Sequence, residues 1–417
     1  MNRERIAIVG TGISGMACAH FLGPHHDVTL FEKDDRVGGH SHTVVVEEGS
    51  DRVPVDTGFM VYNEVTYPLL TRLFRELEVA TKPTLMSFSV RHVGENVEFN
   101  GGSMNLLFGQ RKNLLSPRFW KMLMQIDRFN RETVAELANP AYGDLSLREY
   151  VTARGYGEDF LRWYLSPMAA AVWSSPPERI DEFPARTLMR FWHNHGFLGL
   201  DTQHPWRTVC GGSRSYVEKI TQPFGQHIHR SNGVRKIEGN RVILDDGSQR
   251  DFDRVVVAAH GDQALALLAD PTALESELLG LFHYQENEAV LHTDPRFMPK
   301  TRRCWASWNY RIDGDRHSTH YWMNNLQGVS EREQYFVSIN PPEALPESSV
   351  KRRLVYEHPL FDRAAVAGQE RLPELHAAGR ETKRYFCGAW QRYGFHEDGL
   401  WSAVNTCREI LERDPWS

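Results

Sequence analysis

The sequence predicts an α/β fold built around a Rossmann-like parallel sheet, and three observations predict it. The chain opens with an apolar run, Arg5–Val9, that leads directly into the glycine turn Gly10-Thr-Gly-Ile-Ser-Gly15. A second apolar run, Val28–Phe31, ends in the acid Glu32. Short β-branched runs return in the middle of the chain and at its end. A lone glycine motif is weak evidence, but here the flanking strands and the acid complete a βαβ unit.

Each glycine of the turn has its own physical reason. Gly10 allows the tight turn, Gly12 lets the backbone approach a pyrophosphate, and Gly15 lets a helix predicted over Met16–Leu22 pack closely on the strand. The free N–H groups at the start of that helix would face phosphate oxygens. Glu32 lies 22 residues after Gly10, where its carboxylate can accept hydrogen bonds from both hydroxyls of a ribose. The predicted contacts of this adenine dinucleotide site are Gly10, Gly12, Ile13, Ser14, Gly15, Glu32 and Lys33.

Two further glycine turns follow Glu32. Arg36-Val-Gly-Gly-His40 contains paired glycines, which let the chain pass close to a ligand segment beyond what NAD requires. Asp56-Thr-Gly-Phe-Met-Val-Tyr62 adds an acid and a glycine. Together they indicate a ligand that extends past the first nucleotide.

The stretch Phe31-Glu-Lys-Asp-Asp-Arg-Val-Gly-Gly-His-Ser-His-Thr43 resembles the second motif of the flavin amine oxidase and phytoene desaturase superfamily. The resemblance implies that the cofactor is FAD. It also implies that the paired glycines and their neighbours pass beside FAD and that the Asp-x-Gly turn lies close to the flavin. The contacts implied in this way are Gly38, Gly39, His40, Ser41, Gly58, Phe59 and Met60.

The same resemblance organises the rest of the chain. Signals for the nucleotide-binding part recur in three separate blocks, so we expect a discontinuous FAD-binding domain with an inserted mixed α+β substrate domain, the amine oxidase-like architecture. The first insertion contains predicted helices at 67–77 and 117–138, and the second contains aromatic strands such as 303–310. The predicted FAD-binding domain comprises residues 1–65, 206–285 and 384–417, and the predicted substrate domain comprises residues 66–205 and 286–383.

The middle block consists of short β-branched runs separated by Gly and Asp turns. Thr208–Ser213 precedes a predicted helix over Tyr216–Ile220, and predicted strands follow at 233–237, 241–247 and 252–260. Val234 is expected near the adenine, because it stands on a strand that resembles the adenine-contacting strand of the superfamily.

The end block, Tyr385–Leu400, resembles the superfamily's last motif, in which a strand ends in a glycine and a helix starts beneath the isoalloxazine. Here the helix is predicted over 398–412. Its positive end suits the negative charge that reduction places on the flavin. Cys387 precedes the glycine instead of standing where covalent flavoproteins of the superfamily carry a cysteine, so noncovalent FAD is expected. The implied contacts are Gly388, Ala389, Gly399 and Leu400.

Composition excludes several other classes of protein. The 417 residues are too many for one Rossmann domain, and a net charge of −6 gives no overall electrostatic reason to expect nucleic acid. The five cysteines form no CxxC pair, so neither a disulfide framework nor a metal site is indicated. No signal peptide or membrane-spanning run is recognised. We therefore expect a cytoplasmic protein.

The segment 106–132 combines many basic residues with apolar residues at helical spacing, among them Phe119, Met122, Ile126 and Phe129. Two interpretations stay open. The basic residues form a solvated face on a helix that packs into its own domain, or the helix lies peripherally on the anionic inner face of the cytoplasmic membrane.

Phrases such as Ser307-Trp-Asn-Tyr310 and Gly394-Phe-His-Glu-Asp-Gly399 resemble the bacterial flavoprotein branch found with cyclopropane-fatty-acid synthases and methyltransferases. That branch includes a desaturase implicated in furan fatty acid formation. The resemblance implies an unsaturated or methylated acyl substrate, either as a fatty acid or within phospholipid. It also implies an acyl methyltransferase or cyclopropane-fatty-acid synthase as a functional partner.

The leading hypothesis is a desaturase that passes a hydride to FAD. His396 and Glu397 are candidates to accept the proton, and Tyr62 is a candidate to orient substrate or flavin. Most of the aromatic residues in the insertions are expected in the core, with a minority lining an acyl tunnel. A flavin amine oxidase that produces peroxide is an alternative, although no lysine stands near Ala289–Pro295 to assist dioxygen. A noncatalytic FAD-bound partner of a lipid-modifying enzyme is the other.

Overall fold

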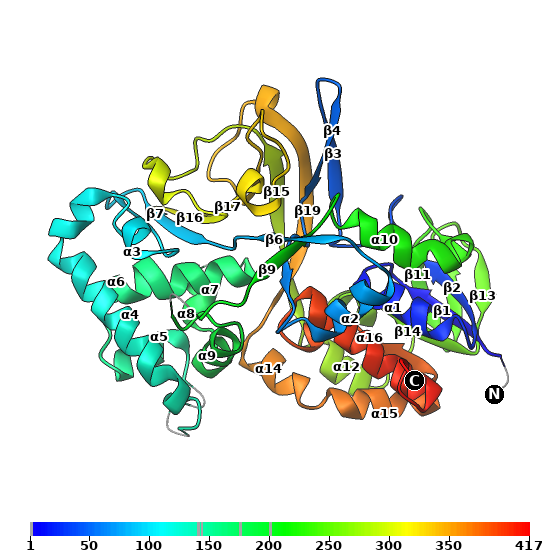
Figure 1. Ribbon diagram of the computed structural model, residues 1–417. Coiled ribbons are helices and arrows are strands. Elements are labelled where there is room, and N and C mark those ends of the chain that lie inside the picture. Colours follow the sequence, from blue (N-terminus) through cyan, green and yellow to red (C-terminus); the bar gives the residue numbers. More distant parts are fainter. Residues whose placement is uncertain (1–2, 140–141, 143–144, 175–176, 200–201) are drawn as a thin grey trace.

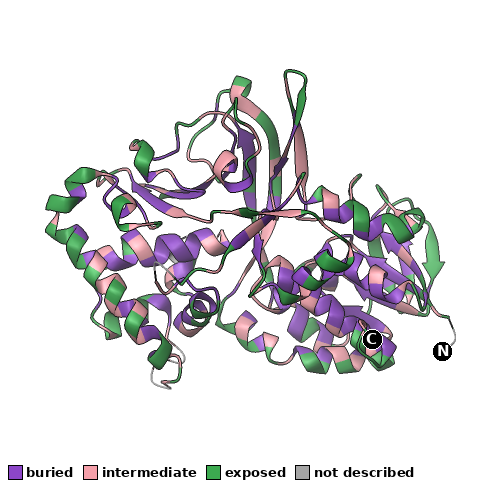
Figure 2. Cartoon of the chain, viewed as in Figure 1, coloured by how far each residue is buried: buried purple, intermediate pink, exposed green. Residues whose placement is uncertain are grey.

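The computed structural model describes residues 3–139, 142, 145–174, 177–199 and 202–417. Figure 1 shows a lobe that carries both chain ends, a lobe of helices on the opposite side, and long strands of a mixed sheet between them. Figure 2 shows many buried residues along the strands and the inner faces of the helices, and exposed residues on the outer faces of the helices.

The first lobe is organised by a five-stranded parallel sheet. Its order is β10 (Ile228–His229), β2 (Asp27–Phe31), β1 (Arg5–Val9), β14 (Arg254–Val257) and β20 (Arg384–Phe386). Strands from the start, the middle and the end of the chain therefore pair directly. This confirms the predicted Rossmann-like sheet and its discontinuous origin.

Both faces of this sheet are buried, as the apolar runs of a parallel sheet require. In β1, Ile6 and Ile8 belong to one core while Ala7 and Val9 belong to another. The first face is covered by α1 (Ile13–Leu22), α10 (Arg214–Thr221) and α16 (His396–Leu411). Helix α1 begins at Ile13, three residues before the predicted start, and α16 begins two residues before its predicted start.

The second face is covered by a small antiparallel sheet and a helix group. The sheet consists of β11 (Val234–Glu238), β12 (Arg241–Leu244) and β13 (Gln249–Asp251). The strands predicted at 233–237 and 241–247 therefore stand apart from the parallel sheet, whereas the one predicted at 252–260 is β14 within it. The helices are α11 (Gly261–Leu267), α12 (Ala273–Leu279), α14 (Arg363–Gln369) and α15 (Leu372–Thr382). Helix α15 packs against β20 and α12, so this end of the segment 286–383 lies on the first lobe.

A seven-stranded sheet joins the two insertions. Its order is β19 (Val350–Leu360), β15 (His283–His292), β18 (Phe336–Ile339), β17 (Arg316–Trp322), β16 (Trp308–Asp313), β7 (Phe88–His92) and β8 (Val97–Asn100). Strand β7 from the first insertion runs parallel to β16 from the second. The two insertions therefore share one sheet.

Part of the strand predicted over 303–310 is wrong. Arg302–Cys304 forms a 3₁₀ turn, and the strand begins only at Trp308. The reason lies in Asn309, whose side chain accepts the Ala306 N–H at 2.9 Å and donates to the Ala306 carbonyl at 2.7 Å. These two bonds satisfy the Ala306 backbone without a partner strand.

Helices of the first insertion form the second lobe (Figure 1). They are α3 (Met104–Leu107), α4 (Pro117–Glu136), α5 (Leu147–Ala153), α6 (Glu158–Phe160), α7 (Ser166–Trp173), α8 (Pro177–Asp181) and α9 (Ala185–Asn194). Among the described residues, no helix is both long enough and apolar enough to span a bilayer.

The apolar face predicted for the helix in the segment 106–132 packs inward. Phe119, Met122 and Phe129 are fully buried in the core, and Ile126 packs against it. This face therefore holds α4 to its own lobe and is not available to a membrane.

Smaller elements connect the lobes. Strands β5 (Tyr62–Asn63), β9 (Trp206–Val209) and β6 (Thr81–Thr84) form a three-stranded sheet, so the run predicted around Thr208 does not belong to the parallel sheet. The remaining elements are the hairpin β3 (Thr43–Glu48) and β4 (Asp51–Asp56), helices α2 (Pro68–Glu76) and α13 (Met323–Gln327), 3₁₀ turns η1 (Arg111–Leu115), η4 (Gln222–His227), η6 (Glu347–Ser349) and η7 (Ala389–Gln391), and a π-helical turn (Leu161–Leu165).

Candidate functional site

A cavity of about 910 Å³ lies between the parallel sheet and the seven-stranded sheet. Its volume is near the upper end of the range for small-molecule sites, about 300–1,000 Å³. One end is lined by the turn between β1 and α1, at the carboxyl edge of the parallel strands. The other end is lined by aromatic residues of the insertions. A long ligand can therefore reach from the glycine turn to the inserted lobe.

The glycine turn is built by close backbone packing. Gly10 has a φ of +99°, and its N–H donates to the Phe31 carbonyl at 2.8 Å. A Cβ on Gly15 would lie 2.0 Å from the Gly10 carbonyl oxygen, whereas a Cβ on Gly12 would meet no atom within 4 Å. Gly15 therefore serves helix packing, and Gly12 leaves open space in front of the α1 N-terminus for a phosphate.

The acid after β2 is held in place but keeps room to accept further bonds. Glu32 Oε2 accepts the Thr11 N–H at 3.0 Å, and Oε1 accepts the Asp34 N–H at 3.0 Å. Glu32 and Lys33 line the cavity with Val234 of β11, which agrees with an adenosine site there. Thr11 was not among the predicted contacts.

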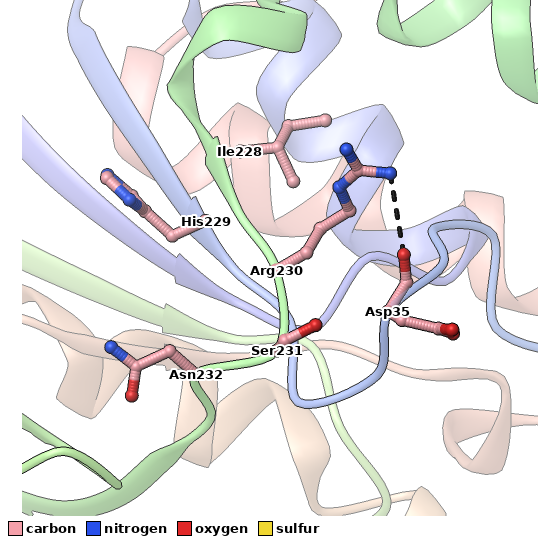
Figure 3. A pocket seen from close by; sticks show the side chains of 6 residues that line it. All are labelled: Asp35, Ile228, His229, Arg230, Ser231 and Asn232. Carbon is pink, nitrogen blue, oxygen red and sulfur yellow. Dashed lines mark hydrogen bonds between the residues drawn. The ribbon is translucent and has the colours of Figure 1, made fainter.

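The strand β10, which the sequence did not reveal, positions this acid. The Glu32 N–H donates to the His229 carbonyl at 2.8 Å, and the Ser231 N–H donates to the Asp34 carbonyl at 3.0 Å. Figure 3 shows the surface hollow beside these residues, where the Arg230 guanidinium donates to the Asp35 carbonyl at 3.4 Å. These bonds fix the turn after β2.

The paired glycines bring the chain against the first turn. Gly39 has a φ of +56°, and a Cβ there would lie 3.0 Å from the Gly12 Cα. Gly38 and Ser41 are not among the described residues that line the cavity. The Gly38 N–H donates to the Thr11 carbonyl, and the Ser41 hydroxyl forms a hydrogen bond with the Tyr216 hydroxyl.

Arg36 gives an independent test of whether a phosphate-bearing ligand fits. It lines the cavity, and its Nη1 atom is buried without a hydrogen-bond partner among the described residues. A buried N–H left unpaired is unfavourable by about 1–3 kcal/mol. A pyrophosphate oxygen would satisfy it, since arginine binds phosphate well. The site therefore fits the FAD that the sequence predicts.

The predicted flavin-end residues divide into two groups. Those that line the cavity are Gly58, Phe59, Met60, Gly388 and Ala389, together with Ile13, Ser14 and His40 from the other motifs. Gly399 and Leu400 lie behind the lining. The Gly399 carbonyl accepts a hydrogen bond from the Ser14 hydroxyl at 2.9 Å, and this bond joins α16 to α1.

His396 is the one proton-acceptor candidate that reaches the cavity among the described residues. Its ring stacks on Phe59 at a centroid distance of 3.9 Å, and Nε2 lies 2.6 Å from the Tyr216 hydroxyl. Burial first, and then His40, lower the pKa of His396 to about 3. The ring is therefore neutral at physiological pH.

Glu397 and Tyr62 have structural surroundings. Glu397 accepts the N–H groups of Leu69 and Leu70, both at 2.9 Å, and so caps the first turn of α2. Burial raises the pKa of Glu397 to about 7 despite these bonds. The buried Tyr62 donates to Thr81 Oγ1 at 3.4 Å and packs on Phe74. Neither residue lines the cavity.

Three histidines from distant segments meet in the cavity wall. The His40 ring centroid lies 6.3 Å from that of His260 and 5.6 Å from that of His358. Burial is the main cause that lowers their pKa values, to about 4 for His40 and about 3 for His260 and His358. Only His40 stands in a recognisable motif. The other two are brought there by β14 and β19, and no sequence signal marks them.

The far end of the cavity is aromatic. Of the aromatic residues that the sequence places in the insertions, Trp173, Phe191, Phe197, Trp308 and Tyr321 line it, whereas Trp192, Trp305, Tyr310 and Trp322 do not. The lining share of this group is therefore larger than the expected minority. No described cysteine lines the cavity, and Cys387 instead lies 3.8 Å from Cys18, sulfur to sulfur.

Comparisons with known proteins agree with this geometry. The model of the family described as flavin containing amine oxidoreductase matches residues 13–411. No curated protein sequence matches the chain. The site's fit and the family match confirm the predicted cofactor FAD, and the cavity is consistent with noncovalent binding.

Solved structures share the fold over almost the whole chain. A putrescine oxidase has 14% identity and a TM-score of 0.67, with 99% of this chain and 100% of that chain covered. A putative protoporphyrinogen oxidase from Exiguobacterium sp. 255-15 has 16% identity and a TM-score of 0.67, with 99% and 100% covered. A fatty acid isomerase from P. acnes has 13% identity and a TM-score of 0.64, with 98% and 97% covered. At these identities the likeness shows the fold alone.

We expect two alanine substitutions in the glycine turn to separate cofactor binding from folding. Gly12→Ala places a methyl group in the open space before α1, so it should weaken FAD binding by about tenfold or more, equivalent to about 1.4 kcal/mol. It should change the free energy of unfolding of the apoprotein by less than about 1 kcal/mol. Gly15→Ala should lower that free energy by about 1–3 kcal/mol through overpacking. FAD titration and urea unfolding measure the two effects, and equal losses of stability would contradict the assignment.

The cavity histidines predict a pH dependence of stability. A histidine whose folded pKa lies below its unfolded value stabilises the fold above the unfolded pKa, and this contribution is lost as the pH falls toward the folded pKa. Stability should therefore fall from about pH 6.5 toward pH 4. His358→Gln should reduce the proton uptake on unfolding in this window by about one proton. Urea unfolding at several pH values with excess FAD gives the slope of the free energy of unfolding against pH. The same slope in His358→Gln and in the wild type would show that His358 is solvated in the folded protein.

Proposed function

The chain belongs to the flavin containing amine oxidoreductase family, and from this premise we propose that it is an FAD-dependent desaturase of unsaturated or methylated acyl chains, carried by fatty acids or phospholipids. The observation that supports the proposal is the aromatic end of the cavity. Its walls come from α7, α9, β9, β16 and β17, next to the motif residues Phe59 and His396. A hydrocarbon chain suits such a surface, because burying apolar groups is favourable and needs no polar partner.

Most of the charged side chains that line the cavity belong to its nucleotide end. The charged lining residues are Glu32, Lys33, Asp34, Arg36, Glu286 and Glu357 in the described residues. The first four belong to the nucleotide motifs, and Glu357 contacts His260 and Gln263. Among the described residues, Glu286 and Glu357 are the lining carboxylates outside the nucleotide motifs, and Glu357 already has polar partners. This small number of carboxylates that could pair with an amine cation supports an acyl chain over an amine.

The reaction removes one hydride from an activated allylic carbon and one proton from the neighbouring carbon, and a new carbon–carbon double bond forms. FAD supplies the oxidising chemistry by accepting the hydride, and a separate electron acceptor must later reoxidise it. Delocalisation activates the allylic C–H bond, so the protein needs no strong base. Its tasks are to orient the chain, exclude water and accept the proton.

His396 is the side chain best placed to accept that proton. If its Nε2–H donates to the Tyr216 oxygen, Nδ1 is left with a free lone pair that can accept a proton. Burial lowers the pKa of His396, so the ring is unprotonated before the reaction but is a weak base, which suits only an activated C–H bond. The stack on Phe59 and the bond to Tyr216 fix the ring. His396 is therefore proposed as the proton acceptor, with Tyr216 as a positioning residue.

A similarity in fold supports an acyl substrate, and such a substrate suggests a functional partner. A fatty acid isomerase shares this fold, which supports the view that the architecture can hold an acyl chain. A methylated substrate must be supplied by an acyl-modifying reaction, so an acyl methyltransferase or cyclopropane-fatty-acid synthase is proposed as a functional partner. The proposed location is the cytoplasm.

Anaerobic mixing of the FAD-loaded protein with a methylated, unsaturated phospholipid tests the proposal. We expect the flavin absorbance to bleach, because the substrate delivers two electrons in the absence of any other protein. Putrescine or an aromatic amine, used as the comparison substrate, should leave the flavin oxidised. Absorbance in a stopped-flow instrument measures both.

Two outcomes would overturn the proposal. Bleaching by amines with peroxide release in air would identify an amine oxidase. If fatty acids and phospholipids with and without a methyl branch leave the flavin yellow, the protein is a noncatalytic FAD-bound partner.

Substitution of His396 tests the proton-acceptor role. His396→Ala should slow flavin reduction by about a hundredfold, in the range that general base catalysis contributes. Tyr216→Phe should slow it less, because the ring of His396 keeps its stack on Phe59. Rates measured under anaerobic single-turnover conditions decide this, after FAD content is matched. If His396→Ala reduced its flavin at the wild-type rate, His396 would not be the proton acceptor.

A further inference from the structure

We propose that residues 104–124, which form α3, η1 and the first turns of α4 and are here called the shoulder, dock on an anionic phospholipid bilayer. This interaction is separate from the flavin site and does not depend on which reaction that site performs. Figure 1 shows the shoulder at the outer edge of the helical lobe, and in Figure 2 many of its residues are coloured as exposed.

Five large apolar side chains of the shoulder are exposed. Leu115 is 87% exposed and Met124 is 63% exposed, so both stand in solvent. Met104, Leu114 and Trp120 are 53%, 46% and 42% exposed. Scattered single apolar residues are ordinary on protein surfaces, but five within one short segment are not.

The charges on the shoulder all have one sign. Arg111, Lys112, Arg118 and Lys121 carry positive charge, and residues 104–124 contain no Asp or Glu. Lys112 and Lys121 are exposed and form no ion pair within the described part of the chain. Arg111 donates to the Phe108 carbonyl and the Asn105 side chain, which leaves its charge without an acidic partner. Arg118 alone is neutralised, by Glu95 and Asp159.

The shoulder is a different surface from the helix face that the sequence predicted. The buried face of α4 packs into its own lobe. Farther along α4, Arg128 pairs with Glu132 and Arg131 pairs with Asp127. The unpaired cations and the exposed apolar side chains therefore coincide only at the N-terminal part of the segment.

Internal contacts hold the shoulder in shape. The Trp120 indole N–H donates to the Leu114 carbonyl at 2.9 Å, and its ring lies 4.9 Å from that of Phe108. Ser116 caps α4 by accepting the Phe119 N–H at 3.3 Å. The apolar tip at Leu115 is therefore carried on a fixed turn.

This combination favours a bilayer as the occupant. Trp and basic residues favour the headgroup region, where apolar side chains reach the acyl boundary and cations meet anionic lipids. A symmetric contact with a second copy would bring Lys112 and Lys121 close to the same cations of that copy, and like charges repel.

Vesicle co-sedimentation of the full-length, FAD-loaded protein tests the proposal. Vesicles of phosphatidylcholine with about 30% phosphatidylglycerol should bind the protein, whereas phosphatidylcholine alone should bind it about tenfold more weakly. Leu115→Ser/Met124→Ser and Lys112→Glu/Lys121→Glu should each weaken binding to the anionic vesicles by about tenfold or more. The matched control is Val134→Ser, which removes a 49% exposed apolar side chain from α4 about 15 Å along the helix from Met124; it should bind like the wild type.

The flavin spectrum and the unfolding midpoint confirm that each variant is folded. The proposal would be overturned if all variants bound the anionic vesicles as tightly as the wild type. It would also be overturned if the wild type bound vesicles with and without phosphatidylglycerol equally well. Vesicle-independent self-association that the Leu115→Ser/Met124→Ser variant abolishes would overturn it too, since this would make the shoulder an interface between copies. Because flavin reduction by a lipid dispersed in detergent is measured separately, failure of docking and failure of the proposed reaction can be told apart.

Discussion

Three backbone segments approach one another closely at the carboxyl edge of the parallel sheet, and the cavity is built around their contacts. Gly10 packs against Gly15 and against the Ala258 carbonyl, and Gly39 packs against Gly12. A Cβ on Gly10, Gly15 or Gly39 would lie 3.0 Å or less from neighbouring backbone, so these three glycines allow β1, α1 and the following loop to touch. Gly12 has open space before it, so the α1 N-terminus can face the cavity directly.

The substrate end depends on contacts of another kind. Strand β7 from the first insertion pairs with β16 from the second, and Glu397 of α16 caps α2. The buried Asp56 accepts the Ser213 N–H at 2.9 Å and the Gln327 side-chain N–H at 2.7 Å. These bonds tie the inserted lobe to the flavin motifs, so the aromatic walls meet the flavin end in one cavity.

How well the sequence predicted a feature follows from how local its physical cause is. The turn around Gly10 and the acid Glu32 act within one βαβ unit, so their positions in the cavity could be expected. Glu397 looked like a proton acceptor because its partners, the N–H groups at the start of α2, are far away in the chain. His260 and His358 reach the cavity only through strand pairing across the whole fold. The two-residue strand β10 is too short to leave a pattern.

The surfaces of the helical lobe were likewise only partly predictable from the sequence. Helical spacing correctly indicated that one side of α4 is apolar, but only the packed structure shows that this side faces the core. The exposed apolar residues Leu114 and Leu115 stand on a 3₁₀ turn before α4, so they lie outside the helical pattern of α4. The sequence alone also does not show which cations of this segment are neutralised. The structure shows that Arg118 forms ion pairs, whereas Lys112 and Lys121 form none within the described residues.

Mass spectrometry of the lipid after a single anaerobic turnover tests most directly whether the flavin site desaturates an acyl chain. We expect a product lighter than the methylated, unsaturated substrate by two hydrogen atoms, formed in equal amount to the reduced flavin. Unchanged lipid, while an amine reduces the flavin and yields an imine or aldehyde, would contradict this expectation.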